Sequence, residues 1–257
     1  MDESARLAGK RALVTGGGRG IGAAIARRLA AEGAAVAVNY VANASSADAL
    51  VRELVDKGYQ AAAFRADVAD RAQTADLVAR VVDEFGGLDI LASNAGVEHF
   101  GTLESITEAD FDRVFRINVA GQLFATQGAA AAMESGGRIL LTSSVSARIA
   151  VHNHALYAAS KAAVSAMALN LAPELAGRGI AINAIAPGGT VTDMAAEVAA
   201  LYSPPALRDV PAEGVIESMS SIGRLADPDE IAAVAAFLLS PDASYLTGAT
   251  IDASGGM

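Results

Sequence analysis

A tyrosine and a lysine four residues apart are the side chains in this sequence best suited to acid–base chemistry. Tyr157 and Lys161 stand near the start of a predicted helix, so their spacing places both on one helical face. A phenol with an ordinary pKa of ~10 is a poor acid–base catalyst at neutral pH. A lysine ammonium one turn away favours the phenolate, and we therefore expect Lys161 to lower the tyrosine pKa. Ser144 adds a hydroxyl after the predicted strand 138–143, at the edge where open α/β sheets bind ligands.

A glycine-rich turn near the amino end could hold phosphate groups. It follows the predicted strand Arg11–Thr15, opens a predicted helix, and contains Gly16, Gly18, Gly20, Ile21 and Gly22. Glycines let the backbone approach a pyrophosphate, while the free N–H groups and the dipole of a helix N-terminus attract it. The strand–turn–helix context indicates a dinucleotide site. The glycine spacing departs from a strict G-x-G-x-x-G. The alternative to a dinucleotide site is therefore a structural turn whose glycines only permit tight packing.

The end of the second predicted strand favours one form of the nicotinamide cofactor. An acidic residue there usually holds the 2′-hydroxyl of NAD, whereas the 2′-phosphate of NADP needs a cation and no carboxylate. Strand 35–39 contains no Asp or Glu and ends in Asn39. Tyr40 follows it directly, and Ser45 comes shortly after. Arg19, inside the glycine turn, could reach an adenosine phosphate, unless it is only a solvated turn residue. The sequence thus favours NADP over NAD.

Short apolar runs alternate with longer helical patterns along the chain. Strands are predicted at 11–15, 35–39, 60–65, 88–93, 138–143, 180–185 and 249–252, and helices at 21–32, 46–57, 71–85, 107–132, 157–176 and 229–239. This alternation indicates a parallel sheet covered on both faces. We predict a single α/β domain over residues 1–257, Rossmann-type and doubly wound, with a seven-stranded parallel sheet. A proline-interrupted segment at about 188–224 is expected to be a substrate lid.

The composition excludes several kinds of site and partner. The chain has 257 residues, 53% of them hydrophobic, a formal net charge of −10 and no cysteine. The missing cysteine excludes disulfides, thiolate nucleophiles and Cys-ligated zinc. His99, His152 and His154 lack a carboxylate or cysteine at ligand spacing, so no metal is expected. The acidic balance argues against nucleic acid, and we find neither an apolar stretch as long as a membrane span nor a basic secretory start, so we expect a cytoplasmic protein.

Motifs spread over essentially the whole chain resemble the short-chain dehydrogenase/reductase family. The order and spacing typical of that family are found in Thr15-Gly16-x-x-x-Gly20-x-Gly22, Asn94-Ala95-Gly96, Ser144 and Tyr157-x-x-x-Lys161, and also in Asp67-Val68, Asn118 and Pro187-Gly188. Each motif alone is weak, but chance is a poor explanation for all of them together. The resemblance implies hydride transfer between a nicotinamide cofactor and a carbonyl or alcohol, with the protein supplying orientation and a proton.

The resemblance also implies roles for particular residues. Tyr157 would give a proton to the carbonyl oxygen, and Ser144 would hydrogen-bond the same oxygen. Lys161 would hold the nicotinamide ribose, and Asn118 would anchor a water that extends the proton relay to solvent. The family is usually tetrameric through helices that correspond to 107–132 and 157–176, so a homotetramer is expected. The residues expected to bind NADP are Gly16, Gly18, Arg19, Gly20, Ile21, Gly22, Asn39, Tyr40, Ser45, Asp67, Val68, Asn94, Ala95, Gly96, Tyr157, Lys161, Pro187, Gly188, Thr190 and Thr192.

One branch of the family, the fungal polyhydroxynaphthalene reductases, is similar in further detail. Matching motifs include Gly96-Val97 followed by His99-Phe100-Gly101, Thr192-Asp193-Met194, and Asn39-Tyr40 at the end of the second strand. This similarity implies NADPH-dependent reduction of a cyclic, aromatic or polyketide-like ketone. Ala195 departs from the aromatic residue that those enzymes carry after the Thr-Asp-Met motif. The expected substrate-lining residues are His99, Phe100, His152, His154, Met194, Tyr202 and Met219.

The residues and motifs of the sequence leave three other functions open. A 3-oxoacyl-[acyl-carrier-protein] reductase usually needs basic residues at the mouth of its active site to meet an acidic carrier protein, and the acidic chain makes this less favourable. An NAD-dependent sugar or polyol dehydrogenase would carry the same motifs. A non-catalytic subunit that senses redox state by binding NADP would keep the glycine turn without turnover.

Overall fold

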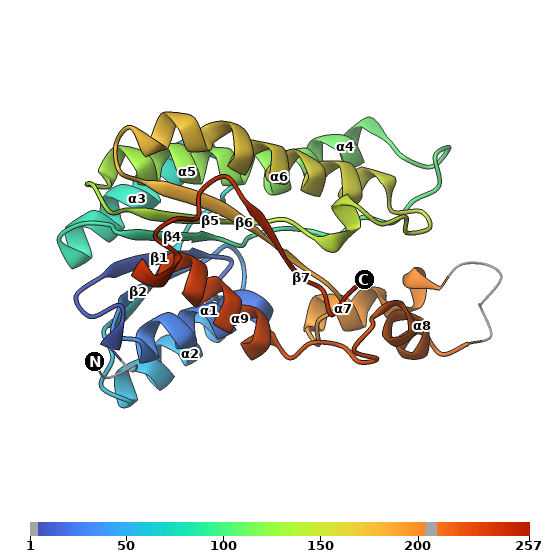
Figure 1. The fold of residues 1–257 in the computed structure, drawn as a ribbon, viewed down its shortest axis with the longest axis horizontal. Helices are drawn as coiled ribbons and strands as arrows, with labels where there is room; N and C mark the ends of the chain where they lie inside the picture. The colour runs from blue at the N-terminus through green and yellow to red at the C-terminus, as the bar shows by residue number, and fades with distance from the viewer. Residues whose placement is uncertain (1–4, 204–209) are drawn as a thin grey trace.

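In the computed structural model, which describes residues 5–203 and 210–257, seven parallel strands form the central sheet (Figure 1). They are β1 (Arg11–Thr15), β2 (Ala35–Tyr40), β3 (Ala61–Arg65), β4 (Ile90–Ser93), β5 (Arg138–Thr142), β6 (Ala181–Pro187) and β7 (Thr250–Ala253). Their order is β3-β2-β1-β4-β5-β6-β7, and every neighbouring pair runs parallel. The predicted Rossmann-type, doubly wound sheet is confirmed.

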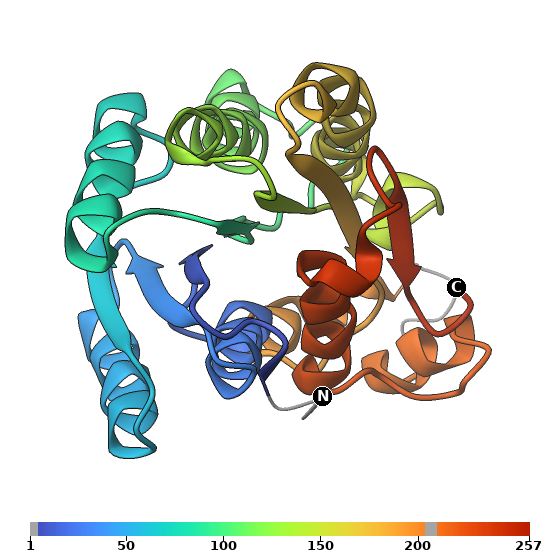
Figure 2. The ribbon, with the colours of Figure 1, turned by 60° about the vertical axis from the view of Figure 1, so that its left-hand side comes forward.

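Helices cover both faces of this sheet (Figure 1, Figure 2). One face carries α3 (Arg71–Phe85), α5 (Gly121–Ala132) and α6 (Ala155–Ala176), with α4 (Glu108–Phe115) beside α6. The other face carries α1 (Gly20–Ala31), α2 (Ala44–Asp56) and α9 (Pro228–Leu239). Two shorter helices, α7 (Asp193–Val198) and α8 (Ala212–Met219), stand beyond one end of the sheet. The helix predicted over 107–132 is divided by a π-helical turn, η2 (Arg116–Ala120), between α4 and α5.

The residue types explain this layering. The central strands are apolar and buried on both faces, as strands of a covered parallel sheet must be. On α1 and α9, which pack on each other, Ala26, Ala30 and Ala235 are fully buried. Such small side chains let two helix backbones approach closely. The alanine-rich composition is therefore used to pack helices tightly against the sheet and against one another.

The strand order reverses between β1 and β4, and this reversal creates the position of the site. From β1 the chain moves outward to β2 and β3, and from β4 it moves the other way to β7. The loops that leave the carboxyl ends of β1 and β4 therefore diverge and leave a crevice between them. Open α/β sheets bind their ligands at such a crevice.

One helix, α6, is long and apolar enough to pass a test of length and composition for a membrane span, with a mean hydropathy of 1.2 over an 18-residue window. The helix contains Lys161 and Glu174, so it is not a stretch free of charged residues of the kind that a spanning helix requires. The helix packs against β6 and η2, and it carries Tyr157 and Lys161 to the cleft described below. These contacts are those of a core helix in a folded domain.

The segment expected to be a lid, 188–224, contains α7, a short 3-10 turn, η4 (Ala199–Tyr202), and α8. Its two ends meet where Thr190 pairs with Ala226, and the N–H of Val191 donates to the Ala226 oxygen at 2.9 Å. Residues 204–209, with two of the three prolines that mark the segment, lie outside the described residues. The role of this segment as a lid stays a prediction.

Candidate active site

A cleft of about 860 Å³ opens at the carboxyl ends of the strands. Its walls come from the loops after β1 to β6, from the start of α6 and from the segment 188–224. Ser144, Tyr157 and Lys161 line the cleft together with most of the glycine turn. The two groups of residues that the sequence singled out for chemistry therefore share one cavity.

The catalytic candidates converge on one end of this cleft. Tyr157 and Lys161 lie on the first two turns of α6, and Lys161 Nζ is 5.5 Å from the centroid of the Tyr157 ring. The same Nζ donates a hydrogen bond of 2.9 Å to the backbone oxygen of Thr142. Ser144 follows β5 directly and lines the same cleft. A carbonyl oxygen placed here would meet two hydroxyl donors, with a cation behind them.

Burial controls the protonation of the tyrosine and the lysine. Burial and the carboxylate of Glu98 raise the pKa of Tyr157 well above its usual range, while the Ser144 hydroxyl lowers it by less. Burial lowers the pKa of Lys161 to about 8, and Glu98 opposes that change. The expected lowering of the Tyr157 pKa by Lys161 is not found. Desolvation of the phenol outweighs a cation that is 5.5 Å from its ring and is engaged with a backbone oxygen.

The glycine turn is fastened to the loop after β4. Gly16 has a positive φ of 60°, which glycine adopts readily. A Cβ on Gly22 would collide with the Gly16 carbonyl oxygen and with Asn94 Nδ2. Asn94 Nδ2 donates to that same oxygen at 3.3 Å, and Thr15 Oγ1 accepts from the N–H groups of Asn94 and Ala95. Gly22 therefore packs behind the turn and does not line the cleft, whereas the cleft is lined by Gly16, Gly18, Arg19, Gly20 and Ile21.

Asn39, at the end of β2, borders the cleft but uses its side chain to brace the fold. It is buried, and its Nδ2 donates to the backbone oxygens of Phe64 and Ala66 at 3.2 and 3.0 Å. Its Oδ1 accepts from the Gly16 N–H at 3.3 Å. The Asn39 amide thus ties the glycine turn to β2 and β3, and the cofactor contact expected of Asn39 stays a prediction.

Polar and cationic groups line the cleft beside the glycine turn. Arg19 lines it, and its guanidinium lies 3.6 Å from the carboxylate of Glu197 on α7. Tyr40 and Ser46 also line it. Ser45 does not, because its hydroxyl donates to the side chain of the residue that caps α2. The expected contact from Ser45 is thus corrected to its neighbour Ser46, at the N-terminus of α2.

Most of the remaining residues expected at the cofactor line the cleft as well: Asp67, Val68, Asn94, Ala95, Gly96, Pro187, Gly188, Thr190 and Thr192. Asn118 lies outside it, fully buried in the π-helical turn. Its amide donates to Val97 O at 2.9 Å and to Ser160 Oγ at 3.0 Å, and it accepts from the Val97 N–H at 2.8 Å. These bonds hold the loop after β4, and the expected part of Asn118 in a proton relay stays a prediction.

The expected substrate residues divide into two groups. The cleft is lined by Met194, Tyr202 and Met219, but not by His99, Phe100, the exposed His152, or His154. His99 instead faces Asp110 at 3.7 Å. His154 is buried and stacks on both Phe100 and Tyr157, with ring centroids 4.3 and 4.5 Å apart. The prediction that these side chains border the substrate is wrong for His154, because its ring supports Tyr157 from behind.

Glu98 is a cleft residue that sequence patterns missed. Its carboxylate accepts a hydrogen bond of 2.7 Å from the Tyr202 hydroxyl and lies 3.0 Å from His154 Nε2. The sequence feature that could have pointed to Glu98 is its position two residues after the Asn94-Ala95-Gly96 motif. Single apolar loop residues carry no comparable signal, and those missed include Val145, Ile149, Val151, Leu225 and Met257.

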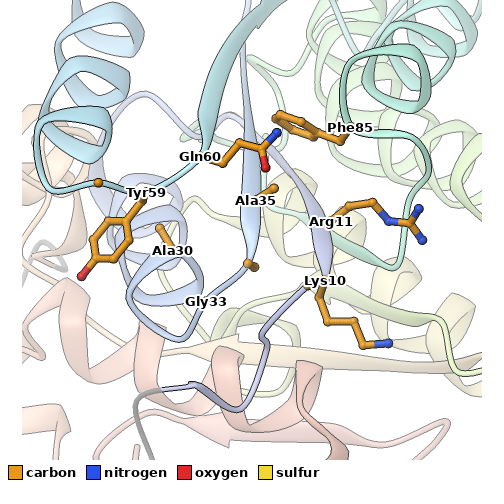
Figure 3. Close-up of a pocket in the computed structure, with 11 residues that line it drawn as sticks. Lys10, Arg11, Ala30, Gly33, Ala35, Tyr59, Gln60 and Phe85 are labelled. Carbon is orange, nitrogen blue, oxygen red and sulfur yellow. The ribbon is translucent and has the colours of Figure 1, made fainter.

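A second cavity, of about 520 Å³, lies at the opposite edge of the sheet, around the amino ends of β1 and β2 (Figure 3). The charged ends of Lys10 and Arg11 point away from Tyr59 there, and Arg11 Nε is bonded to Asp89 at 2.6 Å. None of the residues predicted for catalysis or cofactor binding borders it. Within residues 5–203 and 210–257, no group of three His, Asp or Glu side chains is placed to hold a metal ion. The cleft at the carboxyl ends is therefore the candidate active site.

Comparison with known proteins agrees with this geometry. A family model described as enoyl-(acyl carrier protein) reductase matches residues 16–257. The hydroxynaphthalene reductase-like protein Arp2 of Metarhizium majus is 43% identical over 254 residues, which cover 97% of this chain and 95% of that protein. The chain belongs to the short-chain dehydrogenase/reductase family. Versicolorin reductase 1 of Aspergillus parasiticus is 42% identical to this short-chain dehydrogenase/reductase over 259 residues, which cover 100% of this chain and 99% of that protein.

Solved structures of the same family share the fold closely. A short chain dehydrogenase from Burkholderia cenocepacia, in complex with NADP, is 42% identical, with a TM-score of 0.88 and 98% of each chain covered. The angucycline C-6 ketoreductase LanV with bound NADP is 38% identical, with a TM-score of 0.88, covering 98% of this chain and 96% of that chain. The protein is therefore an oxidoreductase of the short-chain dehydrogenase/reductase type.

Proposed function

We propose that this short-chain dehydrogenase/reductase uses NADPH to reduce the carbonyl group of a cyclic, aromatic or polyketide-like ketone to an alcohol. The observation that carries the proposal is the convergence of Ser144, Tyr157 and Lys161 at one end of a cleft whose other end is the glycine turn. Hydroxynaphthalene and versicolorin reductases among the relatives support the substrate class.

The far end of the cleft fits a dinucleotide with an additional phosphate. The backbone at Gly18 is open to the cleft, and a Cβ there would meet nothing closer than 3.5 Å, at the N-terminus of α2. Arg19, Ser46 and the N-terminus of α2 offer a cation, a hydroxyl and N–H groups to a 2′-phosphate, and β2 ends without a carboxylate. The NADP bound in the Burkholderia and LanV structures supports the same cofactor here.

NADPH, when bound, supplies the hydride that reduces the carbonyl carbon. Tyr157 donates its phenolic proton to the carbonyl oxygen, so that C=O becomes CH–OH. A phenol is protonated at neutral pH even at its ordinary pKa of ~10, and this is the state that reduction requires. Ser144 donates a hydrogen bond to the same oxygen as negative charge develops there. Lys161 stabilises the phenolate that remains until Tyr157 regains a proton.

The walls beside the catalytic end are suited to rings. Val145, Ile149, Val151, Met194 and Met219 line this cleft. Apolar walls of this kind favour a ring system over a sugar or polyol, whose many hydroxyls would lose their hydrogen bonds to water. They do not support an NAD-dependent polyol dehydrogenase. A 3-oxoacyl-[acyl-carrier-protein] reductase and a non-catalytic NADP sensor are likewise less supported by the named relatives.

The proposal extends to assembly, location and the lid. A homotetramer formed through α4, α5 and α6 is supported by apolar side chains exposed on those helices, Phe111, Leu123 and Leu169. Light scattering at several protein concentrations tests it.

We also propose that segment 188–224 covers the substrate, since Met194, Tyr202 and Met219 in it line the cleft. A cytoplasmic location belongs to the same proposal, and cell fractionation tests it.

Turnover assays with purified protein test the function directly. The panel contains ring ketones such as β-tetralone, quinones, acetoacetyl thioesters and polyols, each with NADPH or NADH. We expect ring ketones with NADPH to give the highest kcat/KM. Faster turnover of acetoacetyl thioesters, or of polyols with NAD, would reject the proposed substrate class. A higher kcat/KM with NADH would reject the cofactor.

A further inference from the structure

Three side chains from distant parts of the chain meet beside the catalytic tyrosine. Glu98 follows β4, His154 directly precedes α6, and Tyr202 belongs to segment 188–224. The Glu98 carboxylate accepts from the Tyr202 hydroxyl at 2.7 Å and lies 3.0 Å from His154 Nε2. We call these three residues the Glu98 cluster. It is not used by the proton transfer proposed above, yet it touches the residue that performs it.

Stacking joins the cluster to Tyr157. The His154 ring lies nearly parallel to the Tyr157 ring, at an interplanar angle of 16° and a centroid distance of 4.5 Å. The His154 side chain is fully buried, and among the described residues its Nδ1 has no hydrogen-bond partner. The contact with Glu98 is therefore the polar contact that fixes the ring. In return, His154 and Tyr202 fix the carboxylate.

The fixed carboxylate still reaches the cleft. The Glu98 side chain is 11% exposed and is part of the cleft wall. An ionised carboxylate has about four acceptor positions, and the contacts with His154 and Tyr202 occupy two of them. Glu98 thus keeps the capacity to accept a hydrogen bond from a molecule in the cleft, close to Tyr157.

The charges around the cleft define which molecule fits. The described lining residues with a formal charge are Arg19, Asp67, Glu98, Lys161 and Asp193. Of these two described cations, Lys161 contacts Tyr157, with its Nζ 5.5 Å from the ring centroid and bonded to Thr142 O. Arg19 belongs to the glycine turn, at the other end of the cleft. A negative group on the substrate would therefore meet the Glu98 carboxylate among apolar walls, where like charges repel strongly.

We propose that Glu98 is a specificity-determining residue, whose carboxylate accepts a hydrogen bond from a hydroxyl group of the ketone and repels ketones that carry a negative charge near the carbonyl. This inference rests on the proposed ketone reduction and narrows its substrate class to neutral, hydroxylated ring ketones. The hydroxyl of such a ketone donates a hydrogen bond to the Glu98 carboxylate, and its ring packs against the apolar walls of the cleft.

The test compares kcat/KM with NADPH for β-tetralone, a ring-hydroxylated β-tetralone, and β-tetralone with a carboxylate at the same ring position. The wild-type enzyme should prefer the hydroxylated to the carboxylated ketone by at least about 100-fold, because one gains a charge-assisted hydrogen bond and the other meets a like charge. In Glu98→Gln, which keeps the shape and removes the charge, this ratio should fall at least about tenfold.

Two variants serve as controls. Glu104→Gln removes an exposed carboxylate from the same loop and should leave the ratio unchanged. Tyr202→Phe keeps the Glu98 charge and removes one of its bonds, so the preference against the carboxylated ketone should persist. If Glu98→Gln does not fold, as judged by circular dichroism, the wild-type and Tyr202→Phe ratios decide the question.

Three results would overturn the inference. The first is a wild-type enzyme that reduces the carboxylated and hydroxylated ketones equally well. The second is a Glu98→Gln enzyme that reduces β-tetralone with an unchanged ratio, and the third is loss of the preference in Tyr202→Phe. In these cases β-tetralone is still reduced, so the proposed function stands. If the wild-type enzyme reduces none of the three ketones, the proposed function and the inference fail together.

Discussion

Replacing Lys161 with methionine should make the protein more stable while it removes the activity. Burial lowers the pKa of Lys161 from 10.5 to about 8, so the folded protein holds this ammonium group at a cost. At ~1.4 kcal/mol per pKa unit, the cost at neutral pH is about 3 kcal/mol. Methionine removes that cost and has a similar length. It also removes the hydrogen bond to Thr142 O, worth ~1 kcal/mol, although that oxygen still accepts from Gln122 Nε2 at 3.1 Å.

The net prediction is a gain of about 2 kcal/mol in the free energy of unfolding of Lys161→Met at pH 7. For a chain of this size that corresponds to a rise in Tm of ~4–8 °C. The gain should shrink as the pH rises from about 8 to 10.5, because over that range the folded wild type has lost the lysine proton while the unfolded chain still binds it. Above 10.5 the neutral amine carries no ionic cost in either state.

Urea unfolding followed by circular dichroism at pH 7 and at pH 10 measures this difference. Lys57→Met is the matched control, because Lys57 is exposed just after the end of α2 and pairs only with Glu53 in the described contacts, so its loss should change stability by less than about 0.5 kcal/mol. A Lys161→Met protein that is less stable than the wild type at pH 7, or whose advantage does not decline with pH, would show that the buried ammonium group does not destabilise the fold.

Three further predictions concern the cofactor end and the fold. Gly22→Ala should weaken NADPH binding and destabilise the protein by ~1–3 kcal/mol, because its Cβ would strike Gly16 O. Gly177→Ala, whose Cβ would meet nothing closer than 3.9 Å, should do neither, and calorimetry measures both. Arg19→Ala should lower the NADPH-to-NADH ratio of kcat/KM at least about tenfold, and an unchanged ratio would remove Arg19 from the phosphate site. Asp89→Asn should cost ~1–3 kcal/mol at pH 7, because burial raises the Asp89 pKa but its hydrogen bonds and ion pair with Arg11 lower it by more. That loss should vanish as the pH falls through the lowered pKa and protonates wild-type Asp89, and urea titrations at pH 7 and in acid check it.

The architecture was predictable because each local signal pointed to the same fold. Strand–helix alternation predicts the sheet, and Thr107 with Asp110 forms a capping box that opens α4 close to the predicted start of the helix at 107. The π-helical turn at 116–120 was not predictable, because the helical pattern of 107–132 runs through it and the amide contacts of Asn118 that accompany it are with distant residues.

The site was predictable where residue type alone determines the role. Tyr157, Lys161 and the glycines that line the cleft are of this kind. Asn39 and Ser45 show the limit, because a polar residue at the right position can point its side chain into the fold rather than into the cleft. Glu98 shows the converse, since its importance comes from contacts with His154 and Tyr202, which are 56 and 104 residues away in the chain.

In the proposed mechanism, Tyr157 supplies the proton for an NADPH-dependent ketone reduction. The most direct measurement is the steady-state rate of β-tetralone reduction by Tyr157→Phe, with NADPH binding followed by fluorescence in the same preparation. The variant should bind NADPH as the wild type does and reduce the ketone at least about 100-fold more slowly, because a general acid contributes that much. Ketone reduction at the wild-type rate, with NADPH bound normally, would show that Tyr157 is not the proton donor.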